Sequence, residues 1–122
     1  MEYRFYNPNP AGRNVSDCAV RAVAKALDLS WEEAFICLAV QGLMDSDLPH
    51  ANHVWGDFLK NRGFQRGSVP DGITVREFAD EHQKGTYVLA MSGHVATIQD
   101  NVLYDSWPSE NEVVLYFLGK ER

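Results

Sequence analysis

The hydrophobic periodicity of this 122-residue chain changes once, at Gly85. Before that glycine, apolar residues recur at helical spacing, whereas after it short β-rich runs alternate with turn residues. Helices that precede strands, rather than alternating with them, are typical of an α+β fold. We therefore expect N-terminal helices packed on a C-terminal antiparallel sheet. The length suits a single domain, covering residues 1–122.

Four helices are expected before Gly85. Ser16 or Asp17 can cap a first helix, whose apolar positions 19, 22, 23, 26 and 27 share one face. A capping box opens the second helix, and another opens the fourth. The second helix is expected to end near Gly42, and the fourth at Gly85. These boxes are Ser30 with Glu33, and Thr74 with Glu77. A third helix is expected over about 50–62, and residues 1–14, rich in Asn and Pro, are expected to be irregular.

Four strands are expected after Gly85, over residues 86–91, 94–98, 102–104 and 113–118. Asp100 and Asn101 suit the two-residue turn of a β-hairpin. That turn would pair position 99 with position 102. It fixes which side chains of the two strands share a face, because side chains alternate between faces along a strand.

Charge and hydropathy exclude several classes of protein. The formal net charge is −6, which argues against nucleic acid as a partner and against a polybasic membrane anchor. The longest apolar run, 34–40, is far shorter than the ~20 residues that span a bilayer. The first residues hold no apolar stretch of signal-peptide length. We therefore expect a cytoplasmic protein that does not bind a membrane.

The two cysteines, Cys18 and Cys37, differ in their expected positions. Cys18 lies at the start of the first helix, where free N–H groups and the helix dipole favour a thiolate, the nucleophilic form. Cys37 lies in the middle of the second helix and is expected to be a core residue. Two alternatives stay open at this point: Cys18 as a small core residue, and a single Cys18–Cys37 disulfide.

The hairpin brings a histidine and a carboxylate to one face. The residues that share this face are His94, Ala96, Ile98, Leu103, Asp105 and Trp107. Asp105 is then the diagonal neighbour of His94, within side-chain reach. A carboxylate beside an imidazole fixes its tautomer and stabilises the imidazolium. The alternative is that His94 is a partly exposed strand residue and that Asp105 begins a turn.

The order Cys18, His94, Asp105 resembles that of the papain-like cysteine peptidases. That family places its cysteine at a helix start, its histidine on a strand and its Asn or Asp on the next strand. The segment 105–107, Asp-Ser-Trp, is similar to the Asn-Ser-Trp of papain, so the resemblance implies that Trp107 shields the His94–Asp105 pair. The segment 17–19, Asp-Cys-Ala, resembles the start of the bacteriocin-leader peptidases, a compact bacterial branch, and 17–22 is similar to small phage and bacterial proteins.

The chain departs from this family at one position. The family has a Gln about six residues before the cysteine, which donates to the oxyanion, whereas position 12 is Gly. Asn14 also carries an N–H₂ donor and is the candidate replacement, with the Cys18 backbone N–H as the second donor. Asn14 as a turn residue is the alternative. Because this Gln is missing, a peptidase fold that has lost its catalytic activity is a further alternative.

The resemblance implies a thiol hydrolase of peptide or isopeptide bonds with Cys18, His94 and Asp105 as its triad. The expected partner is a peptide or protein substrate, and we expect no cofactor. His50 and His53, with acidic residues nearby, could hold a divalent metal, but we interpret them as a solvated helix start and expect no metal. The alternatives are an inactive binding module on the same fold, and an amidase or acyl transferase using the same triad.

Overall fold

The computed structural model describes residues 1–121. The helices are α1 (Cys18–Leu27), α2 (Trp31–Asp45), α3 (Asn52–Lys60) and α4 (Val75–Glu81). The strands are β1 (Glu2–Phe5), β2 (Gln65–Gly67), β3 (Thr86–Met91), β4 (His94–Gln99), β5 (Val102–Asp105) and β6 (Val114–Lys120). The fold is therefore α+β, as expected. Both predicted capping boxes are present, at the starts of α2 and α4.

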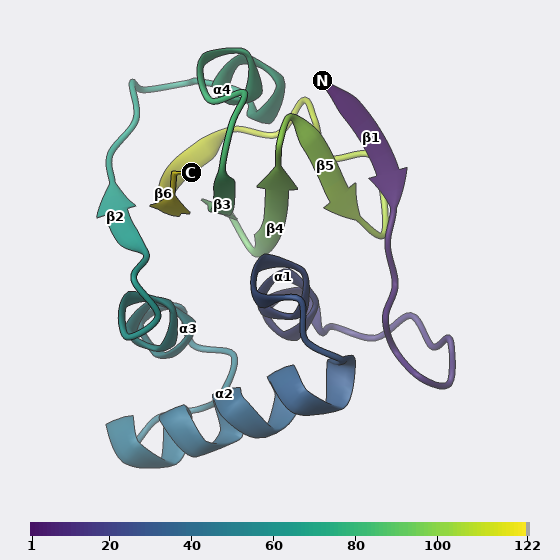
Figure 1. The fold of residues 1–122 in the computed structure, drawn as a ribbon, viewed down its shortest axis with the longest axis vertical. Helices are drawn as coiled ribbons and strands as arrows, with labels where there is room; N and C mark the ends of the chain where they lie inside the picture. The colour runs from purple at the N-terminus through teal and green to yellow at the C-terminus, as the bar shows by residue number, and fades with distance from the viewer. Residues whose placement is uncertain (122) are drawn as a thin grey trace.

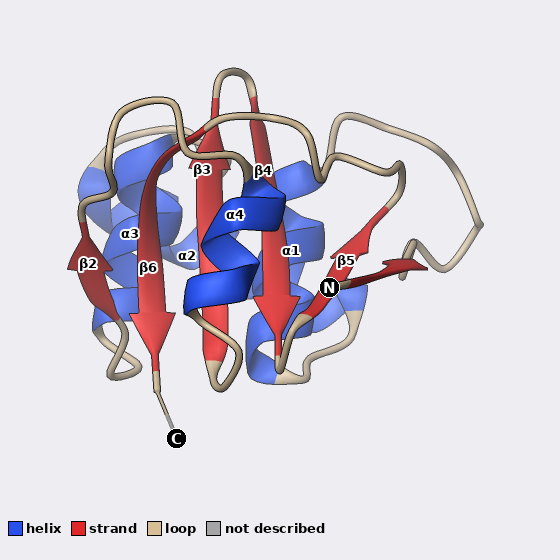
Figure 2. Ribbon diagram, turned by 90° about the horizontal axis from the view of Figure 1, so that it is seen from above, coloured by secondary structure: helices blue, strands red, loops and turns tan. Residues whose placement is uncertain are grey.

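The six strands form one sheet in the order β1-β5-β4-β3-β6-β2, with helices on both faces. Helices α1, α2 and α3 lie on one side of the sheet, and α4 lies alone on the other (Figures 1 and 2). Each side has its own apolar core because side chains alternate along the strands. In β3, Val88 and Ala90 pack toward α1, whereas Leu89 and Met91 pack toward α4.

The sheet differs from expectation at its two edges. Residues 2–5 were expected to be irregular, but they form β1, which pairs in parallel with β5, so the sheet is mixed rather than antiparallel. At the other edge the unexpected strand β2 pairs with β6. Both added strands are short and largely exposed, so they lack the alternating apolar pattern that indicates a strand.

The β4–β5 hairpin has the predicted register. Asp100 and Asn101 both have positive φ, 49° and 68°, as a type I′ turn requires. Gln99 pairs with Val102, and Ile98 pairs with Leu103. This register brings the start of β4 and the end of β5 to the same end of the sheet.

The second helix is longer than predicted. Gly42 was expected to end it, but α2 continues to Asp45, and Ser46 is the left-handed residue that terminates it. Gly42 instead lies where the backbone of residues 47–49 packs closely against α2. A Cβ there would lie 2.8 Å from the carbonyl oxygen of Asp47 and 3.1 Å from the nitrogen of Pro49, in the segment that returns toward α3.

Within residues 1–121, no helix combines the length and the apolar character needed to cross a membrane.

Gly42 and Gly56 form a matched pair for testing this packing. Both are buried glycines inside helices, but a Cβ at Gly56 meets nothing within 4 Å. We predict that Gly56→Ala stabilises the protein by up to about 1 kcal/mol, because alanine is the better helix former. Gly42→Ala should destabilise it by about 1–3 kcal/mol, because the collision with the backbone outweighs the gain in helix propensity. Urea unfolding measures both changes, and stabilisation by Gly42→Ala would contradict this account.

Candidate active site

Cys18 is the first residue of α1, at the end of the helix where backbone N–H groups have no intrahelical partner. Asp17 occupies the N-cap position, but its side chain makes no capping bond to the helix. Cys18 is half-buried and its thiol is free. Cys37, in the middle of α2, is also free and packs against the apolar core, so the two cysteines form no disulfide.

His94 is the first residue of β4 and lies between the thiol and a carboxylate. Its Nε2 is 2.7 Å from Oδ2 of Asp105, which confirms the predicted hydrogen bond. Cys18 lines the same cavity as this imidazole, and each of the two groups shifts the pKa of the other. Since Nε2 is engaged by Asp105, Nδ1 is the ring nitrogen left for the sulfur. His94 therefore lies between the thiol of Cys18 and the carboxylate of Asp105.

These contacts shift the pKa values of Cys18 and His94 in opposite directions. Burial by itself raises the pKa of the Cys18 thiol, but its hydrogen bonds with His94 and the Val95 backbone outweigh this and hold the pKa below its ordinary value. Burial acts on His94 in the opposite sense. Its hydrogen bonds to Asp105 and Cys18 prevail and raise its pKa to about 9. The arrangement favours a thiolate beside an imidazolium at neutral pH.

Asp105 is completely buried and is satisfied by four donors. Oδ2 accepts from His94 and, at 2.6 Å, from the Ser109 hydroxyl. Oδ1 accepts from the Ser106 backbone N–H at 2.7 Å and from Arg21 at 3.2 Å. Burial raises the pKa of this carboxyl, but the hydrogen bonds from His94 and Ser109 lower it below its usual value. The carboxylate is thus ionised and fixed in orientation.

Arg21 extends this set of contacts into α1, and its role was not predicted from the sequence. The buried guanidinium bonds to Asp17 at 2.6 Å and to Asp105 at 3.2 Å. The other oxygen of Asp17 accepts from the indole N–H of Trp31, at 2.8 Å. The spacing of Asp17 and Arg21, four residues apart at a helix start, was the available signal, since such residues share a helix face.

A cavity of about 300 Å³ opens beside the thiol. Three parts of the chain line it: residues 16–20 at the start of α1, Met91 and 93–95 around the β3–β4 turn, and His50 and Asn52 just before and at the start of α3. Trp107 covers one side of the imidazole, with its ring centroid 4.9 Å from that of His94, and is itself 40% exposed. A larger cavity, of about 510 Å³ near Arg66 and Lys120, has no Cys, Ser or Thr among the described residues that line it.

The remaining predicted residues lie outside this constellation. Asn14 is exposed in the segment between β1 and α1 and is not among the residues that line the cavity, so its role as oxyanion donor stays a prediction. The two histidines interpreted as a solvated helix start have different neighbours. His50 lines the cavity beside Cys18, whereas His53 contacts the carboxylates of Asp45 and Asp57.

No family model, curated protein or solved structure matches this chain. The geometry and chemistry of the site are therefore the basis for assigning a function.

Arg21 provides a test of the buried network. We predict that Arg21→Met lowers the free energy of unfolding by about 3–5 kcal/mol, because two buried carboxylates lose their shared cation. Arg76→Met is the matched control, because the Arg76 side chain is half exposed and its ion pair with Glu110 is long, at 3.7 Å. That change should cost less than about 1 kcal/mol. Urea unfolding compares the two variants, and equal costs would show that the Arg21 contacts add nothing to stability.

Proposed function

We propose that this protein is a thiol hydrolase of peptide or isopeptide bonds, with Cys18 as nucleophile, His94 as general acid and base, and Asp105 as the residue that orients His94. The placement of the thiol beside an imidazole that is hydrogen-bonded to a buried carboxylate carries this proposal. It meets the two requirements of nucleophilic catalysis by cysteine, a base within reach of the sulfur and a third group that fixes the base.

The proposed reaction has two steps. The Cys18 thiolate attacks the carbonyl carbon, and the imidazolium of His94 gives its proton to the leaving amine as the C–N bond breaks. This leaves a thioester on Cys18 and a neutral His94. His94 then takes a proton from water, the resulting hydroxide attacks the thioester, and the acid product leaves as the thiolate re-forms. The backbone N–H of Cys18 is positioned as one donor to the oxyanion.

The placement of the three residues also supports the papain-like assignment. Cys18 begins a helix, His94 begins a strand and Asp105 ends the next strand along the chain, which is the arrangement that the resemblance implied. Trp107 against the imidazole agrees with the shielding role expected of it. Free thiols at both cysteines agree with a reducing compartment such as the cytoplasm.

The cavity limits the substrate. Its volume of about 300 Å³ accommodates a short stretch of peptide rather than a folded surface. The negative charge of the whole chain favours neutral or basic targets over acidic ones. We therefore propose an extended peptide or a chain terminus, lying between the start of α1, the β3–β4 turn and the start of α3.

Alkylation of Cys18 tests this proposal without knowledge of the substrate. We predict that iodoacetamide at about pH 6 labels Cys18 faster than Cys37, because the neighbours of Cys18 stabilise its thiolate, whereas Cys37 packs against the apolar core. The rate at Cys18 should fall in the order wild type, Asp105→Asn, Asp105→Ala. Asn keeps the shape but loses the charge that stabilises the imidazolium, and Ala also frees the ring to rotate.

The control is Cys37→Ala, which should keep the labelling rate of Cys18, and circular dichroism should show that each variant is folded. Hydrolysis of a peptide library by the wild type, lost in Cys18→Ala and kept in Cys37→Ala, would establish the reaction. Equal labelling of the two cysteines would favour the inactive binding module instead. The same holds if the labelling rate of Cys18 depends on pH identically in the wild type, Asp105→Asn and Asp105→Ala.

A further inference from the structure

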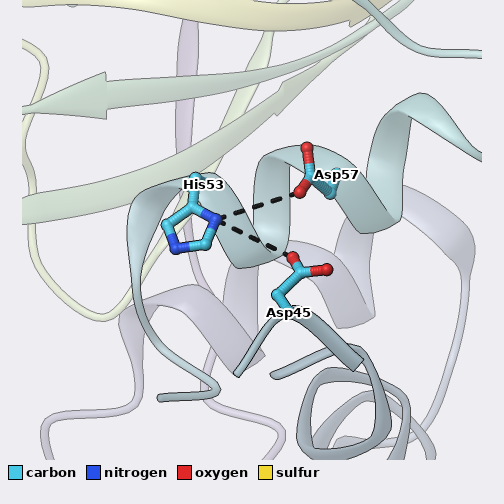
Figure 3. A group of neighbouring side chains, drawn as sticks. All are labelled: Asp45, His53 and Asp57. Carbon is cyan, nitrogen blue, oxygen red and sulfur yellow. Dashed lines mark ion pairs between the residues drawn. The ribbon is translucent and has the colours of Figure 1, made fainter. Parts of the chain in front are cut away.

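A second cluster of polar side chains lies outside the candidate active site, where the end of α2 meets the start of α3 (Figure 3). His53 Nδ1 is 3.8 Å from Oδ2 of Asp45 and 3.9 Å from Oδ2 of Asp57. One donor atom from each of the three residues lies within 4.8 Å of the other two. His53 and Asp57 are four residues apart on α3 and so share a helix face, which Asp45 approaches from α2.

Asp45 supplies a separate observation. Its Oδ2 is buried and has no hydrogen-bond partner, although this is the oxygen directed at His53 and Asp57 (Figure 3). Its other oxygen accepts from the side chain of Gln41 at 3.0 Å, so the orientation of the carboxylate is fixed. A buried carboxylate oxygen without a donor costs free energy, and a bound cation in front of it would remove that cost.

His53 is also held with one nitrogen directed at these carboxylates. Its Nε2 is engaged by the carboxylate of Asp47, which leaves Nδ1 facing Asp45 and Asp57. Metal-binding histidines typically use their second nitrogen in this way, because a carboxylate on that nitrogen orients the ring and makes it a better ligand.

We propose that Asp45, His53 and Asp57 bind one divalent cation of the zinc class. One imidazole nitrogen and two carboxylate oxygens are a ligand set that Zn²⁺ accepts, with water as the fourth ligand. Ligand atoms on a tetrahedral zinc lie about 3.4 Å apart, so the three side chains would have to move closer together to bind the ion. All three side chains are at least partly exposed, which gives a hydrated ion access.

The position of this site indicates its role. The cation would join the end of α2 to the first turns of α3, closing the segment 46–51 between them. His50 and Asn52, at the start of α3, line the cavity beside Cys18. The cation would therefore stabilise one wall of the candidate substrate cavity without touching the reacting atoms. This inference is independent of the proposed hydrolase activity.

Calorimetric titration of the full chain with ZnCl₂ tests the site. The titrations use a Cys18→Ala background, so that the thiol cannot bind zinc. We expect one equivalent to bind, with the affinity lowered at least about tenfold by His53→Gln or Asp57→Asn. Asp47→Asn should weaken binding by about 10–100-fold, as loss of the partner of a histidine ligand does. His50→Gln is the matched control and should leave the affinity unchanged.

Zinc should also raise the melting temperature of the parent protein but not that of the His53→Gln variant. His53 and Asp57 lie on the protein surface, and circular dichroism should confirm that their variants are folded. Absence of binding would overturn the inference and leave the cluster as ion pairs around a protonated His53. Binding that survives both His53→Gln and Asp57→Asn, or that His50→Gln abolishes, would also overturn it.

Discussion

The buried carboxylate of Asp105 is the interaction on which the candidate site depends. Removing a charge from water is costly unless hydrogen-bond donors replace the lost hydration. Asp105 has four such donors: His94 at the start of β4, Arg21 in α1, and Ser106 and Ser109 in the turn after β5. These donors come from three parts of the fold. The carboxylate therefore ties α1, β4 and the turn after β5 together at one end of the sheet.

The same contacts connect stability with reactivity. Formal charge alternates along a series of neighbouring side chains, in which each group lies next to one of opposite sign. The series runs Asp17, Arg21, Asp105, His94, Cys18. The cation of Arg21 offsets the cost of burying two carboxylates. Asp105 in turn favours the imidazolium of His94, and the imidazolium favours the thiolate. The electrostatics that hold the first helix against the sheet thus also favour the thiolate form of Cys18.

Local signals in the sequence were sufficient for the fold class and for the contact between His94 and Asp105. The capping boxes marked α2 and α4, and the Asp100-Asn101 turn set the hairpin register, from which the His94–Asp105 contact followed. The sequence could not indicate β1, because an exposed four-residue edge strand lacks an apolar pattern. Arg21 was missed because one of its two buried partners, Asp105, is 84 residues away from it in the chain. The cluster around His53 was interpreted as a solvated helix start, since only the packing of α2 against α3 brings Asp45 to it.

Titration of the His94 ring by NMR tests the central claim most directly. If the thiolate–imidazolium pair exists, the His94 ring stays protonated through neutral pH and loses its proton with a pKa of about 9. In Cys18→Ala the pKa should be lower, because the hydrogen bond and the negative charge of the sulfur are gone. A His94 ring that titrates near 6.5 in the wild type, and equally in Cys18→Ala, would contradict the account, because the thiol would then be protonated and unpaired at neutral pH.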